Sequence, residues 1–188
     1  MVVRAADAGS VALLARALSQ GGVAIIPCDT MYGIVGTAPD TEKRIRVIKG
    51  RGETKPFLQL IAHASWVARI SDLALPPRLA KYWPGPLTII FPARDGGTVA
   101  LRLPDSPFLV KLMDSVGRPL YSTSVNRTGK EPMFDIELMK REFETQVDII
   151  FDAGSVPPGP ASTLVDVTTH PYRVLRSGVV RIPPENLD

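Results

Sequence analysis

The sequence predicts an α/β fold built on one mixed, twisted sheet, and three observations support this prediction. Eight short apolar runs rich in β-branched residues are typical of strands. Between positions 99 and 147 these runs alternate with two segments whose apolar residues recur at helical spacing. The last two runs are separated only by residues 168–172, which are too few for a helical crossover, so part of the sheet must be antiparallel.

The chain opens with a predicted helix and a buried strand. Two glycines at positions 21 and 22 end a helix whose apolar residues recur three or four positions apart, namely Val11, Leu14, Ala15 and Leu18. The run VAIIP (23–27) is continuously apolar, which suits a strand covered on both faces. A second helix is predicted to start at Asp40 or Thr41, to bury Ile45 and Ile48, and to stop at Gly50.

The remaining strands are predicted where further apolar runs begin, at Phe57, Leu87, Val99, Pro119, Val147, Ser162 and Arg173. Two helices lie among them. Ser106 caps the first and Asp135 caps the second, because side-chain oxygens at these positions can accept from free backbone N–H groups. Their inward-facing residues are predicted to be Leu109, Leu112, Met113, Val116, Ile136, Met139 and Phe143.

Length and composition favour a single domain over residues 1–188, with its core between about 10 and 180. A chain of 188 residues, 45% of them hydrophobic, can bury a sizeable core. The sequence contains no internal repeat and no long linker. The final segment IPPENLD (182–188) is expected to extend from the body of the protein.

Charge and cysteine content restrict the class of protein. A net charge of +3 and a pI near 9.2 favour phosphate-bearing partners, without the charge density of a dedicated DNA-binding protein. The single cysteine cannot form an internal disulfide, so a reducing, cytoplasmic location is expected. No apolar run or leader pattern predicts membrane insertion, and one cysteine with two histidines is too few for a structural metal site, so we expect no protein-bound metal.

The segment KGRGETKP (49–56) places three cations on a glycine-containing turn: Lys49, Arg51 and Lys55. Glycine lets the backbone approach a phosphate closely, arginine offers a planar fork, and lysine offers a compact charge. The segment is therefore a candidate anion cradle, although a solvated basic turn explains it equally well. It matches neither the P-loop nor the dinucleotide-binding glycine pattern.

A second polar cluster, YSTSVNRTG (121–129), follows directly from a predicted strand. Ser122, Thr123, Ser124 and Asn126 can both donate and accept hydrogen bonds. Such residues at the end of a strand suit ligand recognition, but ordinary turn chemistry also favours them.

Two arginines, Arg102 and Arg176, interrupt apolar strands, where a cation must reach water, a carboxylate or a ligand. Either they share an anion-binding cleft, or they pair with Asp105 or Asp166, or they point to solvent. Cys28 has no histidine in a recognisable partner motif, so a packing role is favoured over a nucleophilic one.

Several segments, taken in order along the chain, resemble the signature segments of the YrdC-type threonylcarbamoyl-adenylate synthase family: PCDTMYGI, KGRGETKP, WPGPLTII, VALRLP, STSVN followed by TG, STLVDV and VLRSG. The resemblance covers about residues 21–178 and rests on their order and spacing. It implies a YrdC-like twisted sheet of parallel and antiparallel strands, with helices flanking a basic concave cleft. The basic turn, the Ser/Asn loop and both strand arginines would line that cleft.

The resemblance also implies roles for particular residues. The family's tetrad falls on Lys49, Arg51, Ser124 and Asn126, which would hold the ATP phosphates and the adenylate, with Lys49 and Arg51 acting in catalysis. Further nucleotide contacts would be Lys55, Thr98 and Arg176. The residues near threonine and bicarbonate would be Cys28, Thr30, Tyr32, Arg102, Ser122 and Ser162. Cys28 replaces the family's usual threonine, and Leu60 replaces a histidine that some members carry near the amino acid.

The implied activity is L-threonylcarbamoyladenylate synthesis from L-threonine, bicarbonate and ATP, with magnesium carried by the ATP. The product would pass to a downstream tRNA threonylcarbamoyl transferase complex. Two other interpretations stay open: an RNA-binding module for tRNA or double-stranded RNA, and a divergent paralogue with weak synthase activity. Aromatic residues make up only 6% of the chain, so stacking platforms for RNA are scarce, and the intact tetrad argues against the paralogue.

Overall fold

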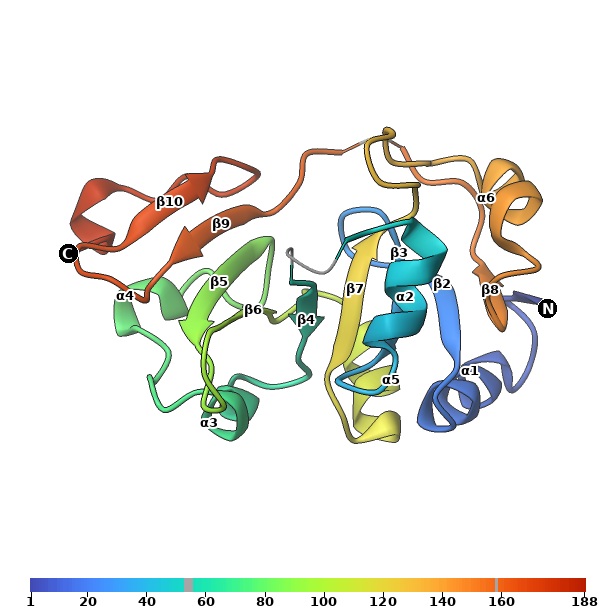
Figure 1. Ribbon diagram of the computed structural model, residues 1–188, viewed down its shortest axis with the longest axis horizontal. Helices are drawn as coiled ribbons and strands as arrows, with labels where there is room; N and C mark the ends of the chain where they lie inside the picture. The colour runs from blue at the N-terminus through green and yellow to red at the C-terminus, as the bar shows by residue number, and fades with distance from the viewer. Residues whose placement is uncertain (53–55, 158) are drawn as a thin grey trace.

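Ten strands form one continuous sheet with the spatial order β1-β8-β2-β3-β7-β4-β6-β5-β9-β10 (Figure 1). The computed structural model describes residues 1–52, 56–157 and 159–188. The strands are β1 (Val2–Arg4), β2 (Val23–Pro27), β3 (Tyr32–Thr37), β4 (Leu58–Leu60), β5 (Leu87–Pro92), β6 (Thr98–Arg102), β7 (Leu120–Ser124), β8 (Ile149–Asp152), β9 (Thr163–Asp166) and β10 (Arg173–Arg176). Parallel and antiparallel pairs are mixed along the sheet, and β9 and β10 are antiparallel, so the predicted mixed sheet is confirmed.

Helices cover the sheet, and the longer ones lie where the sequence predicts them. They are α1 (Ser10–Ser19), α2 (Glu42–Lys49), α3 (Val67–Ile70), α4 (Pro77–Ala80), α5 (Pro107–Val116) and α6 (Ile136–Phe143), with short 3-10 turns at η1 (Ala64–Trp66) and η2 (Pro184–Asn186). Ser106 accepts from Leu109 N at the start of α5, and Gly50 ends α2 in the left-handed conformation. None of the helices in the described ranges has the length and apolar character that crossing a bilayer requires.

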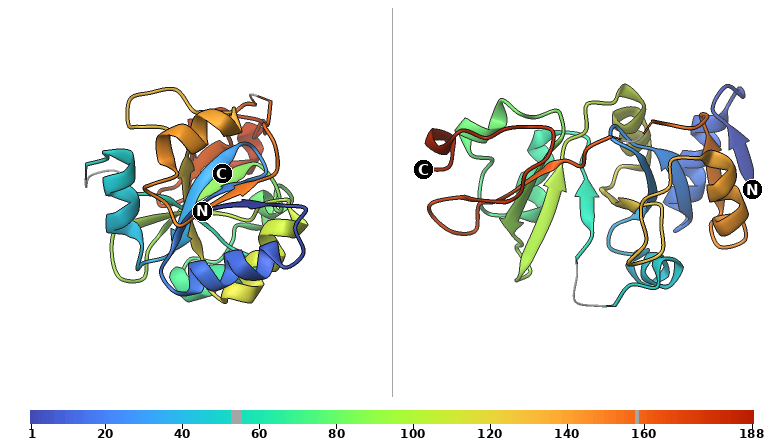
Figure 2. Two further views of the ribbon diagram at one scale, coloured as in Figure 1. Left: turned by 90° about the vertical axis from the view of Figure 1, so that its right-hand side faces the viewer. Right: turned by 90° about the horizontal axis from the view of Figure 1, so that it is seen from above.

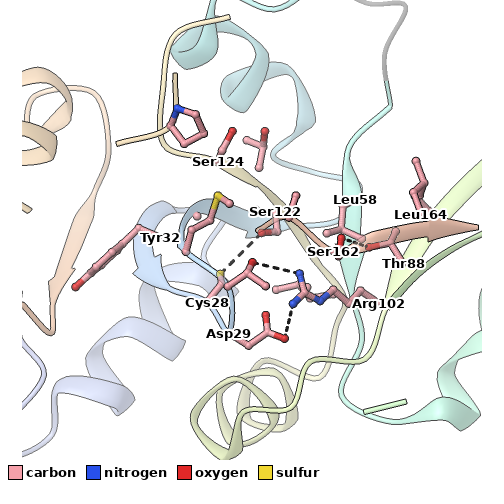
Figure 3. Close-up of a pocket in the computed structure, with 18 of the residues that line it drawn as sticks. Cys28, Asp29, Tyr32, Leu58, Thr88, Arg102, Ser122, Ser124, Ser162 and Leu164 are labelled. Carbon is pink, nitrogen blue, oxygen red and sulfur yellow. Dashed lines mark hydrogen bonds and ion pairs between the residues drawn. The ribbon is translucent and has the colours of Figure 1, made fainter. Parts of the chain in front are cut away.

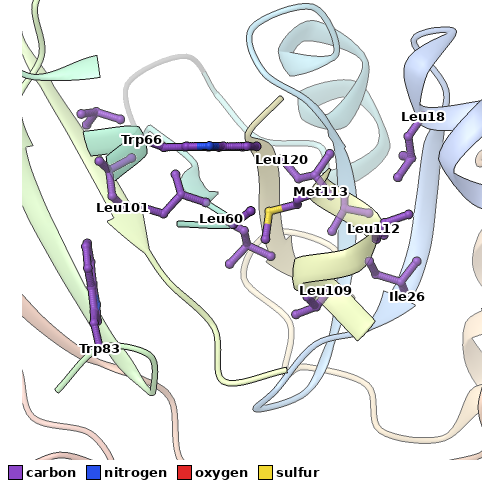
Figure 4. Close-up of a cluster of buried hydrophobic side chains, with 14 of the residues drawn as sticks. Leu18, Ile26, Leu60, Trp66, Trp83, Leu101, Leu109, Leu112, Met113 and Leu120 are labelled. Atoms are coloured by element: carbon purple, nitrogen blue, oxygen red, sulfur yellow. The ribbon is translucent and has the colours of Figure 1, made fainter. Parts of the chain in front are cut away.

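The core is divided between the two faces of the sheet, as alternate residues of β2 show. Ala24 and Ile26 belong to one cluster, which includes residues of α1 and α5, whereas Val23 and Ile25 belong to a second cluster with α2 and α6. Because successive strand residues point to opposite faces, these two helix pairs cover opposite faces of β2, an arrangement that the end-on view in Figure 2 shows. Figure 4 shows part of the first cluster, where Met113 of α5 lies near Leu60 and Leu120.

Two strands, β1 and β3, lie outside the sequence prediction. Strand β3 is fully buried, but its glycines at 33 and 36 weaken the usual strand signal. Both glycines allow close packing: a Cβ at Gly36 would overlap the Thr41 side chain, and a Cβ at Gly33 would lie 3.0 Å from both Cys28 Sγ and Ser122 Oγ. Gly33 therefore lets the segment after β2 lie close to β7.

The C-terminal segment packs against the body, so the prediction that it extends away is wrong. Tyr172 N donates to Leu187 O at 2.7 Å, and Arg78 Nη1 donates to the carbonyls of Glu185 and Asp188 at 2.7 and 2.8 Å. Asn186 is buried. The residues that bind this segment come from α4 and from the loop before β10. Because both are distant in the sequence, the composition of the segment alone could not predict that it packs against the body.

Candidate functional site

A cavity of about 430 Å³ lies over the middle of the sheet, where β7, β4, β6, β5 and β9 are neighbours (Figure 3). The strand register brings its lining residues to one face, because Leu58 pairs with both Ala100 and Ser122, and Thr88 pairs with Leu164. The loop between β2 and β3 closes one side of the cavity with Cys28, Asp29, Thr30 and Met31.

The cavity is basic. Arg51, Arg102 and Arg176 line it, and Asp29 is the one carboxylate among its described lining residues. Burial lowers the pKa of Arg176, and the positive charge of Arg102 lowers it further. Burial, and then the charge of Arg46, lower the pKa of Arg51 in the same direction. Each shift reflects a cation that is partly buried and also lies near another cation, an arrangement that a bound anion would stabilise.

Lys49 lies beside this cavity, at the end of α2, and is buried. Its Nζ donates to Ser124 O at 2.7 Å and to Asn126 Oδ1 at 2.6 Å, so both of these partners are neutral oxygens. Ser124 Oγ donates to the same Asn126 Oδ1 at 2.7 Å. Burial lowers the pKa of Lys49 to about 8, with a further contribution from the charge of Arg51. A phosphate would supply the counter-charge that this ammonium's neutral partners do not.

The Ser/Asn loop is fastened to α2 by backbone contacts as well. Thr128 N donates to Lys49 O at 2.9 Å, and Arg127 Nη1 donates to Ile48 O. Asn126 Nδ2 donates to Lys130 O, which orients the amide so that its oxygen faces Lys49. The two hydrogen bonds of Lys49 Nζ join positions 75 and 77 residues apart, and they bring together three of the four predicted tetrad residues.

The fourth tetrad residue, Arg51, rests on Phe57. The Arg51 guanidinium carbon lies 4.7 Å from the ring centroid, and that of Arg46 lies 5.0 Å from the same ring. Glu42 pairs with Arg46 at 2.6 Å. Arg51 Nη2 donates to Pro56 O at 3.1 Å, while its Nε is buried without a hydrogen-bond partner. The aromatic ring therefore holds the guanidinium at the cavity wall through a cation–π contact.

Replacing Phe57 by leucine is expected to weaken the binding of a non-hydrolysable ATP analogue about two- to thirtyfold, because a cation–π contact contributes about 0.5–2 kcal/mol. Phe57→Tyr keeps an aromatic face and should bind the analogue almost as tightly as the unchanged chain. Calorimetric titration of both variants measures the difference. Equal affinity of Phe57→Leu and the unchanged chain would show that the ring does not position Arg51.

Arg102 and Asp29 form a buried ion pair in the cavity wall (Figure 3). Their side chains are only 5% and 9% exposed, and Arg102 Nη2 lies 2.5 Å from Asp29 Oδ2. Arg102 Nη1 donates to Thr30 Oγ1 at 3.4 Å. Despite their burial, Arg102 Nε and Nη2 and Asp29 Oδ1 make no well-directed hydrogen bond. Of the partners predicted for Arg102, neither Asp105 nor Asp166 takes part, and the carboxylate of Asp29 does so instead.

Arg176 of β10 also lines the cavity and is held by Ser162. Its Nε donates to Ser162 O and its Nη2 to Ser162 Oγ, both at 3.1 Å. Ser162 Oγ also lies 2.8 Å from Thr88 Oγ1 in a buried hydrogen bond. The predicted grouping of Arg102 and Arg176 around one cleft is thus found, with Ser162 beside them.

Tyr32 and Cys28 contribute shape rather than free polar groups. The Tyr32 hydroxyl donates to Gly154 O and accepts from Ala153 N, both at 2.9 Å, so it ties the chain after β8 to the cavity wall. Burial raises the pKa of the Cys28 thiol to about 12. A neutral thiol is a poor nucleophile, which agrees with the packing role predicted for Cys28. Ser122 Oγ lies 3.9 Å from its sulfur.

Of the predicted nucleotide contacts in the described residues, Thr98 lies apart from the cavity, whereas Lys49 and Asn126 are hydrogen-bonded beside the lining residue Ser124 without being lining residues themselves. Lys55 lies outside the described residues. Thr98 begins β6 and is exposed; it shares a face with Ala100 and Arg102 but lies beyond the cavity. Its predicted role would require the nucleotide to extend along β6 past Ala100.

Two polar residues that line the cavity, Asp29 and Thr88, have no role predicted from the sequence. Asp29 is a carboxylate in the polar loop after a buried strand, and Thr88 is the one hydroxyl in the apolar run LTIIF. Thr88 interrupts an apolar run in the same way as Arg102, and this signal could have identified it, whereas Asp29 lies in a polar loop and has no such signal.

Comparisons with known proteins match both the sequence and the fold. The family model Sua5_yciO_yrdC, described as "Telomere recombination", matches residues 16–178. A threonylcarbamoyl-AMP synthase of Pyrococcus abyssi (strain GE5 / Orsay) is 33% identical over 178 residues, covering 86% of this chain and 52% of that protein. A threonylcarbamoyl-AMP synthase of Bacillus subtilis (strain 168) is 30% identical over 186 residues, covering 89% and 53%. The chain therefore spans about half the length of these two curated relatives.

Among solved structures, P. abyssi Sua5 complexed with L-threonine is similar to this chain with a TM-score of 0.85 and 27% sequence identity, over 95% of this chain and 57% of that one. The family match includes the cavity residues from Cys28 to Arg176. Because it covers most of the sequence and the fold agrees, the chain belongs to the Sua5/YciO/YrdC family.

Proposed function

We propose that the chain catalyses L-threonylcarbamoyladenylate formation from L-threonine, bicarbonate and ATP, with release of pyrophosphate. The observation that supports this most strongly is the basic cavity of about 430 Å³, where three arginines line the wall and Lys49 lies alongside. Relatives at 30% and 33% identity are named threonylcarbamoyl-AMP synthase, and P. abyssi Sua5 was crystallised with L-threonine.

In this proposal the neutral amine of threonine, after its ammonium has lost a proton, first attacks the carbon of bicarbonate, and a C–N bond forms as water leaves to give a carbamate. A carbamate oxygen then attacks the α-phosphate of ATP, and the bond to the leaving pyrophosphate breaks. Negative charge develops on the phosphate oxygens and the leaving group, and Lys49 and Arg51 are proposed to neutralise it, which their positions beside and in the basic cavity support. Ser124 and Asn126 keep Lys49 in position. The carbamate itself is the nucleophile, so the reaction does not need the buried thiol of Cys28.

The amino-acid end of the cavity is proposed to be the region around Arg102. The Arg102 guanidinium can pair with a carboxylate, and the hydroxyls of Thr30, Ser122 and Ser162 can form hydrogen bonds with the threonine side chain. Leu60 supplies apolar surface nearby. Arg176 is proposed to face the nucleotide, with Thr98 and Lys55 as further contacts.

Magnesium is proposed to enter with the triphosphate. The described residues contain no group of three or more side chains suited to hold a metal ion, and the one described carboxylate of the cavity is paired with Arg102. The product is a mixed anhydride and reacts readily with water, so we propose that an enzyme transferring the threonylcarbamoyl group to tRNA consumes it in the cytoplasm.

The proposal is tested by measuring pyrophosphate release from ATP and magnesium by the purified chain. Release is expected only when L-threonine and bicarbonate are both present, and serine or alanine should support a slower rate. Release that does not depend on threonine, or equal turnover with alanine, would contradict the proposed substrate. No release under any combination would contradict the activity.

The affinity for a non-hydrolysable ATP analogue is expected to fall as the pH rises above about 8. In the free protein burial lowers the pKa of Lys49 to about 8, whereas a bound phosphate favours the ammonium and raises that pKa. Below pH 8 the lysine is charged in both states, and above it binding must take up a proton, which costs up to about tenfold in affinity per pH unit. Lys49→Arg should remove this dependence, because arginine stays charged. A flat profile for the unchanged chain between pH 7.5 and about 9.5 would exclude Lys49 as a phosphate ligand.

A further inference from the structure

The cavity has an unequal set of charges. Three arginines line it, but Asp29 is the only described lining residue that can form an ionic contact with a cation. Anionic parts of a ligand therefore have several partners to choose from, whereas a positively charged part has one. The position of Asp29 thus decides where in the cavity an ammonium group is accepted.

Asp29 is already engaged with Arg102. The pair is more than nine-tenths buried on both sides, with Nη2 and Oδ2 2.5 Å apart. Asp29 lies in a tight loop closed by a hydrogen bond of 3.0 Å from Cys28 N to Met31 O, so its backbone is held in place on the cavity wall. Asp29 Oδ1 and Arg102 Nε are buried without hydrogen-bond partners, which leaves binding capacity on both members of the pair.

A ligand carboxylate that takes the Arg102 guanidinium must compete with the carboxylate of Asp29. If the ligand brings only a negative charge, the exchange leaves Asp29 buried without a counter-ion, which is strongly unfavourable. In an α-amino acid the ammonium and the carboxylate are bonded to the same carbon, so they lie close together. Its carboxylate can pair with Arg102 while its ammonium pairs with Asp29, so every buried charge keeps a partner.

We propose that Asp29 is a specificity-determining residue that selects a zwitterionic amino acid as the ligand that first enters this end of the cavity, before its amine reacts. This inference rests on the proposed function, because it assigns that end of the cavity to L-threonine. Asp29 accepts from the ligand ammonium and Arg102 donates to the ligand carboxylate. Carboxylic acids without an amine, and amines without a carboxylate, each leave one member of the pair uncompensated and are excluded.

The test compares three ligands that differ in one group each: L-threonine, 2,3-dihydroxybutanoate with a hydroxyl in place of the amine, and threoninol with an alcohol in place of the carboxylate. Dissociation constants are measured by calorimetry or NMR titration of the full chain. The unchanged chain is expected to bind both analogues at least about tenfold more weakly than L-threonine, because a site built around a charged partner rejects the analogue that lacks it. Comparable binding of threonine and the hydroxy acid would overturn the proposal without any variant.

Asp29→Asn is expected to weaken L-threonine at least about tenfold and to leave the hydroxy acid unchanged or tighter, so that the preference disappears. Asp29→Glu keeps the charge and should keep the preference. The matched control is Asp72→Asn, which alters an exposed ion pair with Arg94 and should leave all three affinities unchanged. If Asp29→Asn weakens threonine and the hydroxy acid equally, Asp29 only supports Arg102 and the proposal fails.

The outcomes also separate this inference from the proposed function. Selective threonine binding without pyrophosphate release would contradict the synthase activity and leave the role of Asp29 standing. Pyrophosphate release together with equal binding of threonine and the hydroxy acid would support the synthase activity and contradict the role of Asp29. If L-threonine does not bind the unchanged chain at all, both proposals are wrong.

Discussion

Replacing Lys49 by alanine is expected to lower the rate of pyrophosphate release by at least about a hundredfold, since removing one positioned donor from a developing oxyanion costs about that much. Lys49 is suited to this role because its Nζ is fixed by Ser124 O and Asn126 Oδ1 before any phosphate binds. Little reorganisation is then needed in the transition state. Initial rates at saturating ATP, threonine and bicarbonate measure the effect.

The loss of rate in Lys49→Ala should not be a loss of folding. Both hydrogen-bond partners of the Lys49 ammonium are neutral oxygens, and burial lowers its pKa to about 8, so the variant does not lose a stabilising ion pair. A thermal melt close to that of the unchanged chain is expected. Lys43→Ala, at an exposed position on the same helix, is the control and should keep full activity. A near-normal rate for Lys49→Ala would remove the lysine from the proposed mechanism.

Much of the fold could be predicted because its signals are local. Helix α5 follows from its cap at Ser106 and the apolar spacing behind it, and the antiparallel pairing of β9 with β10 follows from the short connection between them. Strand β3 could not be predicted in this way. Its two glycines are explained by the side chains of Cys28, Ser122 and Thr41 that pack against them, and only the folded chain brings these together.

In the candidate site, too, some features could be predicted from the sequence and others depend on contacts that only the folded chain makes. Lys49, Ser124 and Asn126 were grouped by resemblance, and their mutual hydrogen bonds are found in the structure. The partner of Arg102 could not be inferred, because nearby Asp105 and the acidic residue of β9 were equally plausible in the sequence. Asp29 lies on a different loop and reaches Arg102 only because the register of the sheet brings the two together.

Arg102→Ala is expected to reduce the free energy of unfolding by about 3–5 kcal/mol, the usual cost of leaving one member of a buried ion pair without its partner. The side chain of Asp29 is only 9% exposed, so water cannot easily replace the guanidinium. Urea denaturation followed by circular dichroism measures the change. Arg94→Ala is the control, because its pair with Asp72 is exposed and should contribute less than about 1 kcal/mol.

The double variant Arg102→Ala with Asp29→Ala distinguishes a lost ion pair from a general loss of packing. If the instability of Arg102→Ala comes from the uncompensated carboxylate, removing that carboxylate should restore about 2 kcal/mol or more, and the two substitutions will be strongly non-additive. If instead Arg102 stabilises the fold through the contacts of its aliphatic stem, the double variant will be as unstable as the sum of the single ones. That second result would mean that the Arg102–Asp29 pair contributes little charge coupling, so a ligand carboxylate could take the guanidinium without compensation at Asp29.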